Sequence, residues 1–161
     1  MTIAVGDRLP DVELTRMGAD GPETVALGAL TEGRKVVIFA VPGAYTPTCH
    51  SAHVPSFVRV MSELRAKGID EVICVSVNDP FVMGAWGEAT GATAAGITML
   101  ADADARFTDA IGMQFDASPV GLFGRSKRYA MAAEDGVVTV WHPETESGCV
   151  VSSGEAMLEA L

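Results

Sequence analysis

The chain has 161 residues, 48% of them hydrophobic, which is enough for one domain with a sizeable core. Its 11 basic and 21 acidic side chains leave a net charge of −10 at pH 7. Nucleic acids and anionic membrane surfaces are bound mainly through basic groups, so this balance argues against both partners. The longest apolar run, residues 36–42, is too short to span a membrane, and residues 1–7 show no secretory leader. We therefore expect a cytosolic protein with a single domain over residues 1–161.

The first half of the chain contains one clear strand and one clear helix. Residues 1–30 are short segments separated by glycine and proline, which indicates extended strands and turns. Residues 35–41 are a continuous apolar run rich in β-branched side chains, typical of a strand buried on both faces. Apolar spacing predicts a helix over 46–67, with Thr46 as its N-cap and a kink at Pro55, where the Ser51 carbonyl loses its partner.

The second half alternates strands and helices. We expect strands over residues 71–77 and 97–101, helices over 79–90 and 105–111, and two further strands over 121–133 and 137–141. An Asp-Gly turn at 134–136 joins the last two strands, and Ser152 or Ser153 caps a final helix over 154–161. This order predicts an α/β fold with a central mixed β-sheet flanked by helices and an N-terminal β extension. A strand, turn and helix with a cysteine in the first helical turn is typical of a thioredoxin-like fold.

That cysteine is Cys49, in the segment Pro42-Gly-Ala-Tyr-Thr-Pro-Thr-Cys-His50. In the first turn of a helix, free backbone N–H groups and the helix dipole stabilise a thiolate. A dithiol oxidoreductase needs a second cysteine three residues earlier, but that position holds Thr46. A single thiolate beside a hydroxyl suits attack on a small oxygen-containing substrate. The alternative is an inert cysteine that packs in the core.

The pattern Pro42-x-x-x-Thr46-x-x-Cys49 resembles the active-site signature of the peroxiredoxins. The matching segments are residues 41–49, 53–57, 75–83, 85–86 and 127–129. Together they resemble the type II (peroxiredoxin 5-like) subfamily of the thioredoxin-fold superfamily, and the similarity spans nearly the whole chain. The resemblance implies a thiol peroxidase that reduces hydrogen peroxide and alkyl hydroperoxides through a Cys49 sulfenic acid, without metal or organic cofactor.

The resemblance also implies roles for the neighbours of Cys49. Thr46 would hydrogen-bond the peroxide, and Pro42 would shield the sulfur from bulk water. Arg128 would stabilise the thiolate and the breaking O–O bond, with Arg125 as a second, more solvated candidate. Three further residues are candidates for the substrate site: Gly43 and Ala44 through their backbone N–H groups, and His53, one helical turn after Cys49.

Two more cysteines are candidates for resolving the sulfenic acid. Some type II members carry a cysteine at the position of Cys74, but its apolar neighbours also suit a core cysteine. A direct disulfide from Cys74 would require local unfolding of the helix start. Cys149, just before the last helix, is either a resolving or a packing cysteine. We expect the one-cysteine route, in which glutathione, glutaredoxin or thioredoxin reduces the sulfenate.

Other functions stay open on the residues alone. His50 or His53 beside Cys49 would suit a cysteine hydrolase, although no orienting Asn or Asp and no oxyanion hole is marked. The same thiolate would also serve a peroxide-sensing relay, which oxidises once and stops. The cysteines and histidines lack the paired short spacing of a zinc site, so we expect no metal.

One apolar helical cluster has two interpretations. Its members are Phe81, Val82, Met83 and Trp86. They are either interior packing or, as the resemblance implies, part of a homodimer contact.

Overall fold

The computed structural model describes residues 2–146 and 148–161. The strands are β1 (Glu13–Gly18), β2 (Gly21–Ala26), β3 (Lys35–Ala40), β4 (Glu71–Ser76), β5 (Thr98–Ala101), β6 (Gln114–Ala117), β7 (Leu122–Ser126), β8 (Tyr129–Glu134) and β9 (Val137–Pro143). The helices are α1 (Leu27–Thr31), the π-helical turn η1 (Cys49–His53), α2 (Val54–Ala66), α3 (Pro80–Ala89), α4 (Arg106–Ala110), the 3-10 turn η2 (Ser118–Val120) and α5 (Gly154–Ala160).

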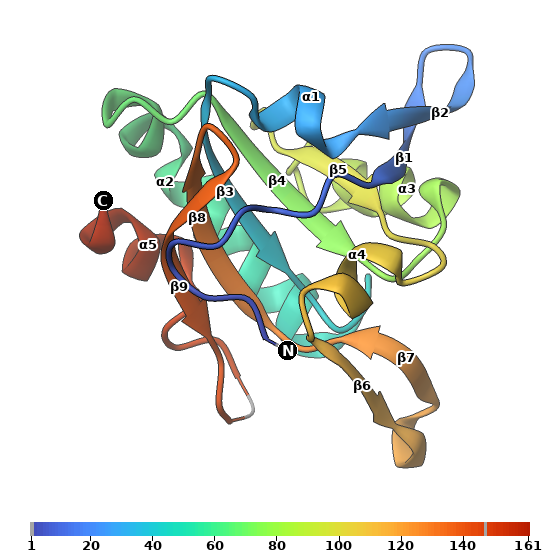
Figure 1. Ribbon diagram of the computed structural model, residues 1–161. Helices are drawn as coiled ribbons and strands as arrows, with labels where there is room; N and C mark the ends of the chain where they lie inside the picture. The colour runs from blue at the N-terminus through green and yellow to red at the C-terminus, as the bar shows by residue number, and fades with distance from the viewer. Residues whose placement is uncertain (1, 147) are drawn as a thin grey trace.

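A seven-stranded sheet forms the middle layer, in the order β2-β1-β5-β4-β3-β8-β9 (Figure 1). Strands β3, β4 and β5 pair in parallel, and the remaining pairs are antiparallel. Strands β6 and β7 form a separate hairpin that projects from one end of the molecule (Figure 1). The expected mixed α/β sheet is thus confirmed, with β1 and β2 as the N-terminal extension at one edge.

Helices cover both faces of the central strands. On one face, α2, α3 and α5 pack against alternate residues of β3 and β4, including Phe39 and Cys74. On the other face, α1, α4 and the N-terminal segment pack against the intervening residues, including Ile38 and Ile73. Because both faces are covered, the inner residues of β3 and β4 are apolar on both sides of the sheet, as the run at 35–41 predicted. Cys49 belongs to the first of these two cores.

The helix expected over 46–67 contains an irregular turn. Residues 47 and 48 are helical, and η1 follows, with the Val54 N–H bonded to the Cys49 carbonyl five residues earlier. Pro55 has no N–H to offer the carbonyl of Ser51, so the regular ladder cannot continue through this segment. The expected kink at Pro55 therefore takes the form of a π-turn just before it, which begins at Cys49.

The single strand expected over 121–133 is wrong. Strand β7 pairs with β6 in the small hairpin, whereas β8 pairs with β3 and β9 in the main sheet. Lys127 and Arg128 join them, and the Lys127 N–H donates to the Met113 carbonyl at 2.7 Å. A run of extended residues does not reveal a change of sheet, because the alternation pattern is the same in both. The crossing places Arg128 at the entrance to β8.

The expected Asp-Gly turn and the caps of α3 and α5 are present. Thr46 occupies the expected N-cap position, since its carbonyl accepts the His50 N–H at 2.9 Å, but its hydroxyl bonds to Cys49 Sγ and the Gly43 carbonyl and not to a backbone N–H of the helix. Asp135 and Gly136, both with positive φ, form the tight turn between β8 and β9. The Asp79 carboxylate accepts the Val82 N–H at the start of α3, at 2.8 Å. Of the two candidate caps for α5, Ser153 is the one used, since its hydroxyl accepts the Ala156 N–H at 3.1 Å.

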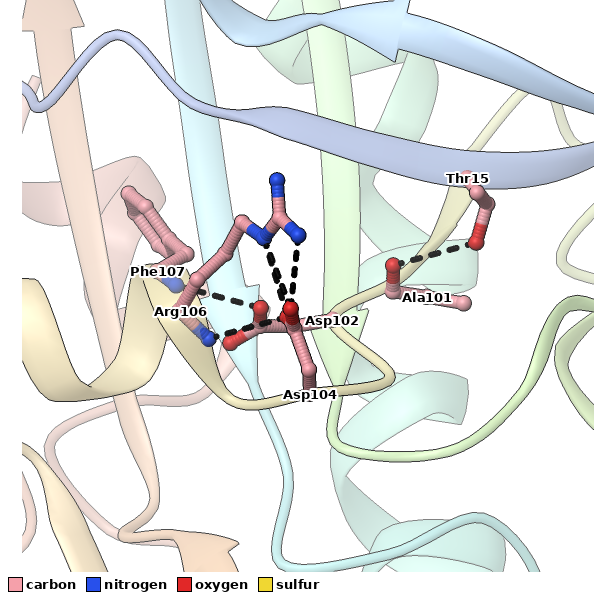
Figure 2. A network of polar contacts seen from close by, with 6 residues as sticks. All are labelled: Thr15, Ala101, Asp102, Asp104, Arg106 and Phe107. Atoms are coloured by element: carbon pink, nitrogen blue, oxygen red, sulfur yellow. Dashed lines mark hydrogen bonds and ion pairs between the residues drawn. The ribbon is translucent and has the colours of Figure 1, made fainter.

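The loop after β5 is held by a local polar network (Figure 2). The buried Asp102 carboxylate accepts the N–H groups of Phe107 and Thr108, which start α4. Beside it, Arg106 pairs with Asp104 at the surface. Each of these contacts closes a loop or starts a helix, so the network fixes the fold here. Within the described residues, no helix is long and apolar enough to cross a membrane.

Candidate active site

Cys49 is fully buried at the start of η1, between two polar side chains. The Thr46 hydroxyl lies 2.7 Å from Cys49 Sγ, and Arg128 Nη2 donates to the same sulfur at 3.1 Å. Thr46 comes from the loop before the helix, and Arg128 from the crossing between β7 and β8. A positive charge and a hydroxyl in contact with a buried sulfur stabilise its thiolate form.

The Thr46 hydroxyl has two acceptors for one proton. Its oxygen lies 2.7 Å from Cys49 Sγ and 2.8 Å from the Gly43 carbonyl. When Cys49 is a thiolate, the hydroxyl can donate to the sulfur. When Cys49 is a thiol, the hydroxyl can donate to Gly43 and accept from S–H instead. This side chain can therefore follow the charge on the sulfur by rotating about its C–O bond.

Arg128 is held from its other side by His53. Arg128 Nη1 lies 2.8 Å from His53 Nδ1, and His53 Nε2 lies 2.8 Å from the carbonyl oxygen of Ser152. Burial, then the Arg128 charge, lowers the pKa of His53 to about 3, so the imidazole is neutral. The guanidinium is only a donor, so Nδ1 accepts and the proton sits on Nε2, which donates to Ser152.

A pocket of about 910 Å³ opens directly above Thr46 and Arg128. Pro42, Thr46 and Arg128 contribute to its lining, while Cys49 lies behind them, out of contact with solvent. The hairpin and η2 supply an apolar wall of Phe115, Val120 and Leu122. The segment after β9 supplies the other wall: Glu144, Thr145, Glu146 and Gly148.

Two substrate-site expectations, and the expected solvation of Arg125, need revision. The Ala44 N–H donates to the Asn78 side-chain oxygen at 3.0 Å, so it is not free for a peroxide. His53 is fully buried and contacts Arg128, so it lies behind the pocket instead of lining it. Arg125 is half-buried and close to Gly43, not solvated, since a Cβ on Gly43 would lie 3.0 Å from Arg125 Nη1. The role of the Gly43 N–H stays a prediction.

The arrangement does not favour a cysteine hydrolase. His50 Nδ1 accepts a hydrogen bond from the Trp86 indole at 3.0 Å, and the His50 ring stacks on Tyr45. Both nitrogens of His53 are bonded to Arg128 and Ser152. Neither imidazole is therefore arranged as a base for Cys49.

The other two cysteines differ in their exposure. Cys74 is fully buried on β4, and burial, then the charge of Cys49, raises the pKa of its thiol well above the usual range. Cys149 is half-buried in the segment before α5, and burial raises the pKa of its thiol as well. The three cysteines form no disulfide. The described residues contain no group of three or more His, Cys, Asp or Glu side chains able to hold a metal ion.

Sequence reasoning missed the residues that support Arg128 from behind. Ser152 was considered only as a helix cap, and Glu144 was not considered at all. Both lie far along the chain from Cys49, and their contacts are made partly through backbone groups, which leave no pattern in the side chains. The one available signal was the adjacent pair Ser152 and Ser153. A helix needs a single N-cap residue, so the second serine was available for a contact elsewhere.

Comparison with known proteins gives a consistent family. A family model described as Redoxin matches residues 4–158. The chain is 51% identical to the chloroplastic Peroxiredoxin-2E-2 of Oryza sativa subsp. japonica, over 99% of this chain and 73% of that protein. It is 46% identical to the chloroplastic Peroxiredoxin-2E of Arabidopsis thaliana, over 99% and 70%. The crystal structure of reduced Prx3 in complex with H2O2 from Vibrio vulnificus has a TM-score of 0.93 and 46% identity, over 99% of both chains.

The expectation of a cytosolic protein is contradicted by this comparison. Both plant relatives are chloroplastic proteins, at 51% and 46% identity. That expectation rested on composition and on the first residues of the chain, and neither distinguishes the cytosol from the interior of an organelle.

Family membership follows from the extent of these matches. The redoxin match covers nearly the whole chain, and the relatives are peroxiredoxin-2 proteins aligned along 99% of it. The Vibrio structure confirms the thioredoxin-like fold of a peroxiredoxin. The chain therefore belongs to the redoxin family and, within it, to the type II peroxiredoxins, which are thiol-dependent peroxidases.

Proposed function

We propose that Cys49 is the peroxidatic residue of this peroxidase. The observation that carries the proposal is the position of its sulfur, 2.7 Å from the Thr46 hydroxyl and 3.1 Å from Arg128 Nη2. The thiolate attacks the terminal oxygen of a hydroperoxide, and the S–O bond forms as the O–O bond breaks. The sulfur is oxidised to sulfenic acid, and the alkoxide or hydroxide leaves and takes up a proton.

Thr46, Arg128 and Pro42 have separate roles in this step. The Arg128 guanidinium stabilises the thiolate and the negative charge that develops on the breaking O–O bond. The Thr46 hydroxyl holds the peroxide, and it can reorient as charge leaves the sulfur. Pro42, at the edge of the pocket, limits the access of water to the sulfur.

The substrates are hydrogen peroxide and alkyl hydroperoxides. Hydrogen peroxide is supported by the Vibrio relative, whose structure is a complex with H2O2. Alkyl hydroperoxides are supported by the size of the pocket, about 910 Å³, and by the apolar side chains of Phe115, Val120 and Leu122 on its wall.

An external thiol recycles Cys49. Burial raises the pKa of both the Cys74 and the Cys149 thiols, which keeps them protonated and poorly nucleophilic. Glutathione, glutaredoxin or thioredoxin attacks the sulfenic sulfur, water leaves, and a second thiol reduces the mixed disulfide. Of the two internal cysteines, Cys149 is the better placed to compete, because it is half-buried while Cys74 has no exposure.

Single-turnover oxidation tests these assignments. Reduced wild type and the variants Cys49→Ser, Cys74→Ser and Cys149→Ser react with one equivalent of H2O2 and are read by intact mass. We expect one added oxygen in all except Cys49→Ser. Loss of two hydrogens that one of the other variants abolishes would identify an internal resolving cysteine, and fast oxidation of Cys49→Ser would refute the assignment of the nucleophile. A protein that oxidises but is not recycled by any of the three thiols would be a sensor.

The active unit is a homodimer. The apolar cluster of α3 is divided, since Met83 and Trp86 are fully buried while Phe81 is 63% exposed. Tyr45, 52% exposed, lies over Trp86 beside the same helix. Sedimentation of Phe81→Glu, compared with Phe123→Glu on β7, tests this contact: we expect only Phe81→Glu to be a monomer. A monomeric wild type would refute the proposal.

A further inference from the structure

We propose that His53 and Glu144 are positioning residues that hold the Arg128 guanidinium against Cys49. His53 contacts Arg128 directly, and Glu144 acts on His53 by fixing the position of the Ser152 carbonyl. The inference rests on the proposed role of Cys49 as the attacking thiolate. It concerns two residues that do not touch the sulfur. His53 lies behind the arginine, and Glu144 lies in the segment between β9 and α5.

The first step is the orientation of Arg128. Two of its nitrogens have fixed partners, Nη2 with Cys49 Sγ at 3.1 Å and Nη1 with His53 Nδ1 at 2.8 Å. A planar guanidinium bonded at both ends of its fork has a defined plane as well as a defined position. Without His53, one contact to a sulfur would leave the long side chain free to rotate toward the pocket, which it also lines.

The second step is the orientation of His53. Its ring is fully buried, and its Nε2–H donates to the Ser152 carbonyl at 2.8 Å. That bond leaves Nδ1 as the nitrogen with a lone pair, which is the form that a guanidinium requires. The Ser152 carbonyl therefore selects the tautomer that holds Arg128.

The third step is the position of Ser152. One oxygen of the Glu144 carboxylate, Oε2, accepts the Val150 N–H at 2.7 Å, the Ser152 N–H at 2.8 Å and the Ser152 hydroxyl at 2.7 Å. The Glu144 N–H in turn donates to the Arg128 carbonyl at 3.0 Å. Residues 148–153 have no helix or strand of their own, so this carboxylate substitutes for a regular ladder. His142 Nδ1 makes one further contact to the same segment, 2.9 Å from the Val151 carbonyl oxygen.

Glu144 acts through the segment and not as a counter-ion. Among the ion pairs of the described residues, none joins Glu144 to Arg128. Three kinds of charged and titratable groups surround the site. Arg128 contacts Cys49, and neutral His53 lies behind Arg128. Cys74 lies behind the site on β4, and Cys149 lies beside Ser152. The pocket in front is lined by Tyr45, Lys127, Glu144 and Glu146. Removing Glu144 should therefore act by displacing Arg128. A second variant that removes a carboxylate elsewhere on the surface controls for the loss of one negative charge.

Glu144→Ala tests the chain of contacts, with Glu155→Ala as the control. Glu155, eleven residues further along the chain, carries the same charge but pairs with Arg59 at the surface. We expect Glu144→Ala to slow the bimolecular reaction with H2O2 by about 10-fold to 100-fold, the order of loss from a misplacement of about 1 Å. We also expect iodoacetamide alkylation of Cys49 to require a higher pH. Glu155→Ala should match wild type in both measurements.

A double variant distinguishes positioning from a separate effect. If Glu144 acts through Arg128, Glu144→Ala should slow Arg128→Ala no further, because the group that it positions is gone. Multiplied losses in the double variant would overturn the proposal. A lower melting temperature with wild-type alkylation and peroxide rates would overturn it too, leaving Glu144 as a structural contact.

Two milder variants cover the case in which Glu144→Ala does not fold. Ser152→Ala removes one of the three bonds to Glu144 and keeps the backbone, so we expect a smaller shift in the same direction. His53→Asn keeps an acceptor near Arg128 and should react faster than His53→Leu, and equal rates would contradict the proposal. Alkylation of Cys49 needs no peroxide turnover, so its pH dependence reports positioning even if the peroxidatic role of Cys49 is wrong.

Discussion

Arg128 and Cys49 are 79 residues apart in the chain, yet Arg128 Nη2 lies 3.1 Å from Cys49 Sγ with both side chains buried. The contact forms because β8 lies beside β3, the strand that leads into the Cys49 loop. This buried positive charge is the main source of electrostatic stabilisation for negative charge on the sulfur and on the reacting peroxide.

Arg128→Ala should slow the reaction of Cys49 with H2O2 by about 100-fold to 1,000-fold, the usual loss when one preorganised donor is removed. Arg128→Lys should be intermediate, because an ammonium cannot span Cys49 and His53 together. Stopped-flow kinetics on reduced protein give these rates. Arg125→Ala is the comparison: an equal loss there would move the role to Arg125, which lies near Gly43.

Thr46→Val should slow the same reaction by about 10-fold to 100-fold, since a hydrogen bond to a charged group contributes about 1.5–3 kcal/mol. Valine keeps the branched shape and removes only the hydroxyl, which lies 2.7 Å from the sulfur. Thr46→Ser keeps the hydroxyl and should stay close to wild type. The rates can be followed by the fluorescence of Trp86, whose indole donates a hydrogen bond to His50, the residue after Cys49. Equal rates for the valine and serine variants would contradict a role for the hydroxyl.

The sequence was most informative where a local rule applied, and least where distant segments meet. Cys49 and Thr46 lie in one helical turn, so their proximity followed from spacing alone. The position of Arg128 came from the resemblance, because local pattern predicted a single strand through it. The contact from Ser152 to His53 had no local signal, since a backbone carbonyl is present at every residue. The same limit explains why Ala44 was wrongly expected to bind the peroxide: its N–H donates to the side chain of Asn78, which belongs to another segment.

His53 should make the stability of the fold depend on pH. Burial and Arg128 lower its pKa from 6.5 to about 3, so between these values the unfolded chain binds a proton that the folded chain does not. The stabilisation from burying neutral His53 is therefore complete above about pH 6.5. As the pH falls from there to about pH 3, the free energy of unfolding decreases by about 1.4 kcal/mol per pH unit.

Urea unfolding of wild type and His53→Asn from pH 7 to pH 4 measures this contribution. The carboxylates titrate in both proteins, so the difference in unfolding free energy isolates His53. We expect the wild type to lose stability more steeply as the pH falls. Parallel curves would mean that His53 takes up its proton at the same pH in the folded and the unfolded chain, and Arg128 would then need another acceptor at acidic pH.

Gly154→Ala should destabilise the protein by about 1–3 kcal/mol, the usual cost of overpacking. A Cβ at Gly154 would lie 2.7 Å from the Ser56 carbonyl carbon and 2.9 Å from the Phe57 Cα, both backbone atoms of α2. The Gly154 N–H also donates to the Ser56 hydroxyl at 2.9 Å, so α5 cannot move away without losing that bond. Gly18→Ala is the control, because its new Cβ would meet the carboxylate end of the exposed, flexible Glu23 side chain instead. Thermal unfolding should therefore show a clear loss for Gly154→Ala and a small change for Gly18→Ala, whereas equal melting temperatures would mean that α5 can shift on α2 at little cost.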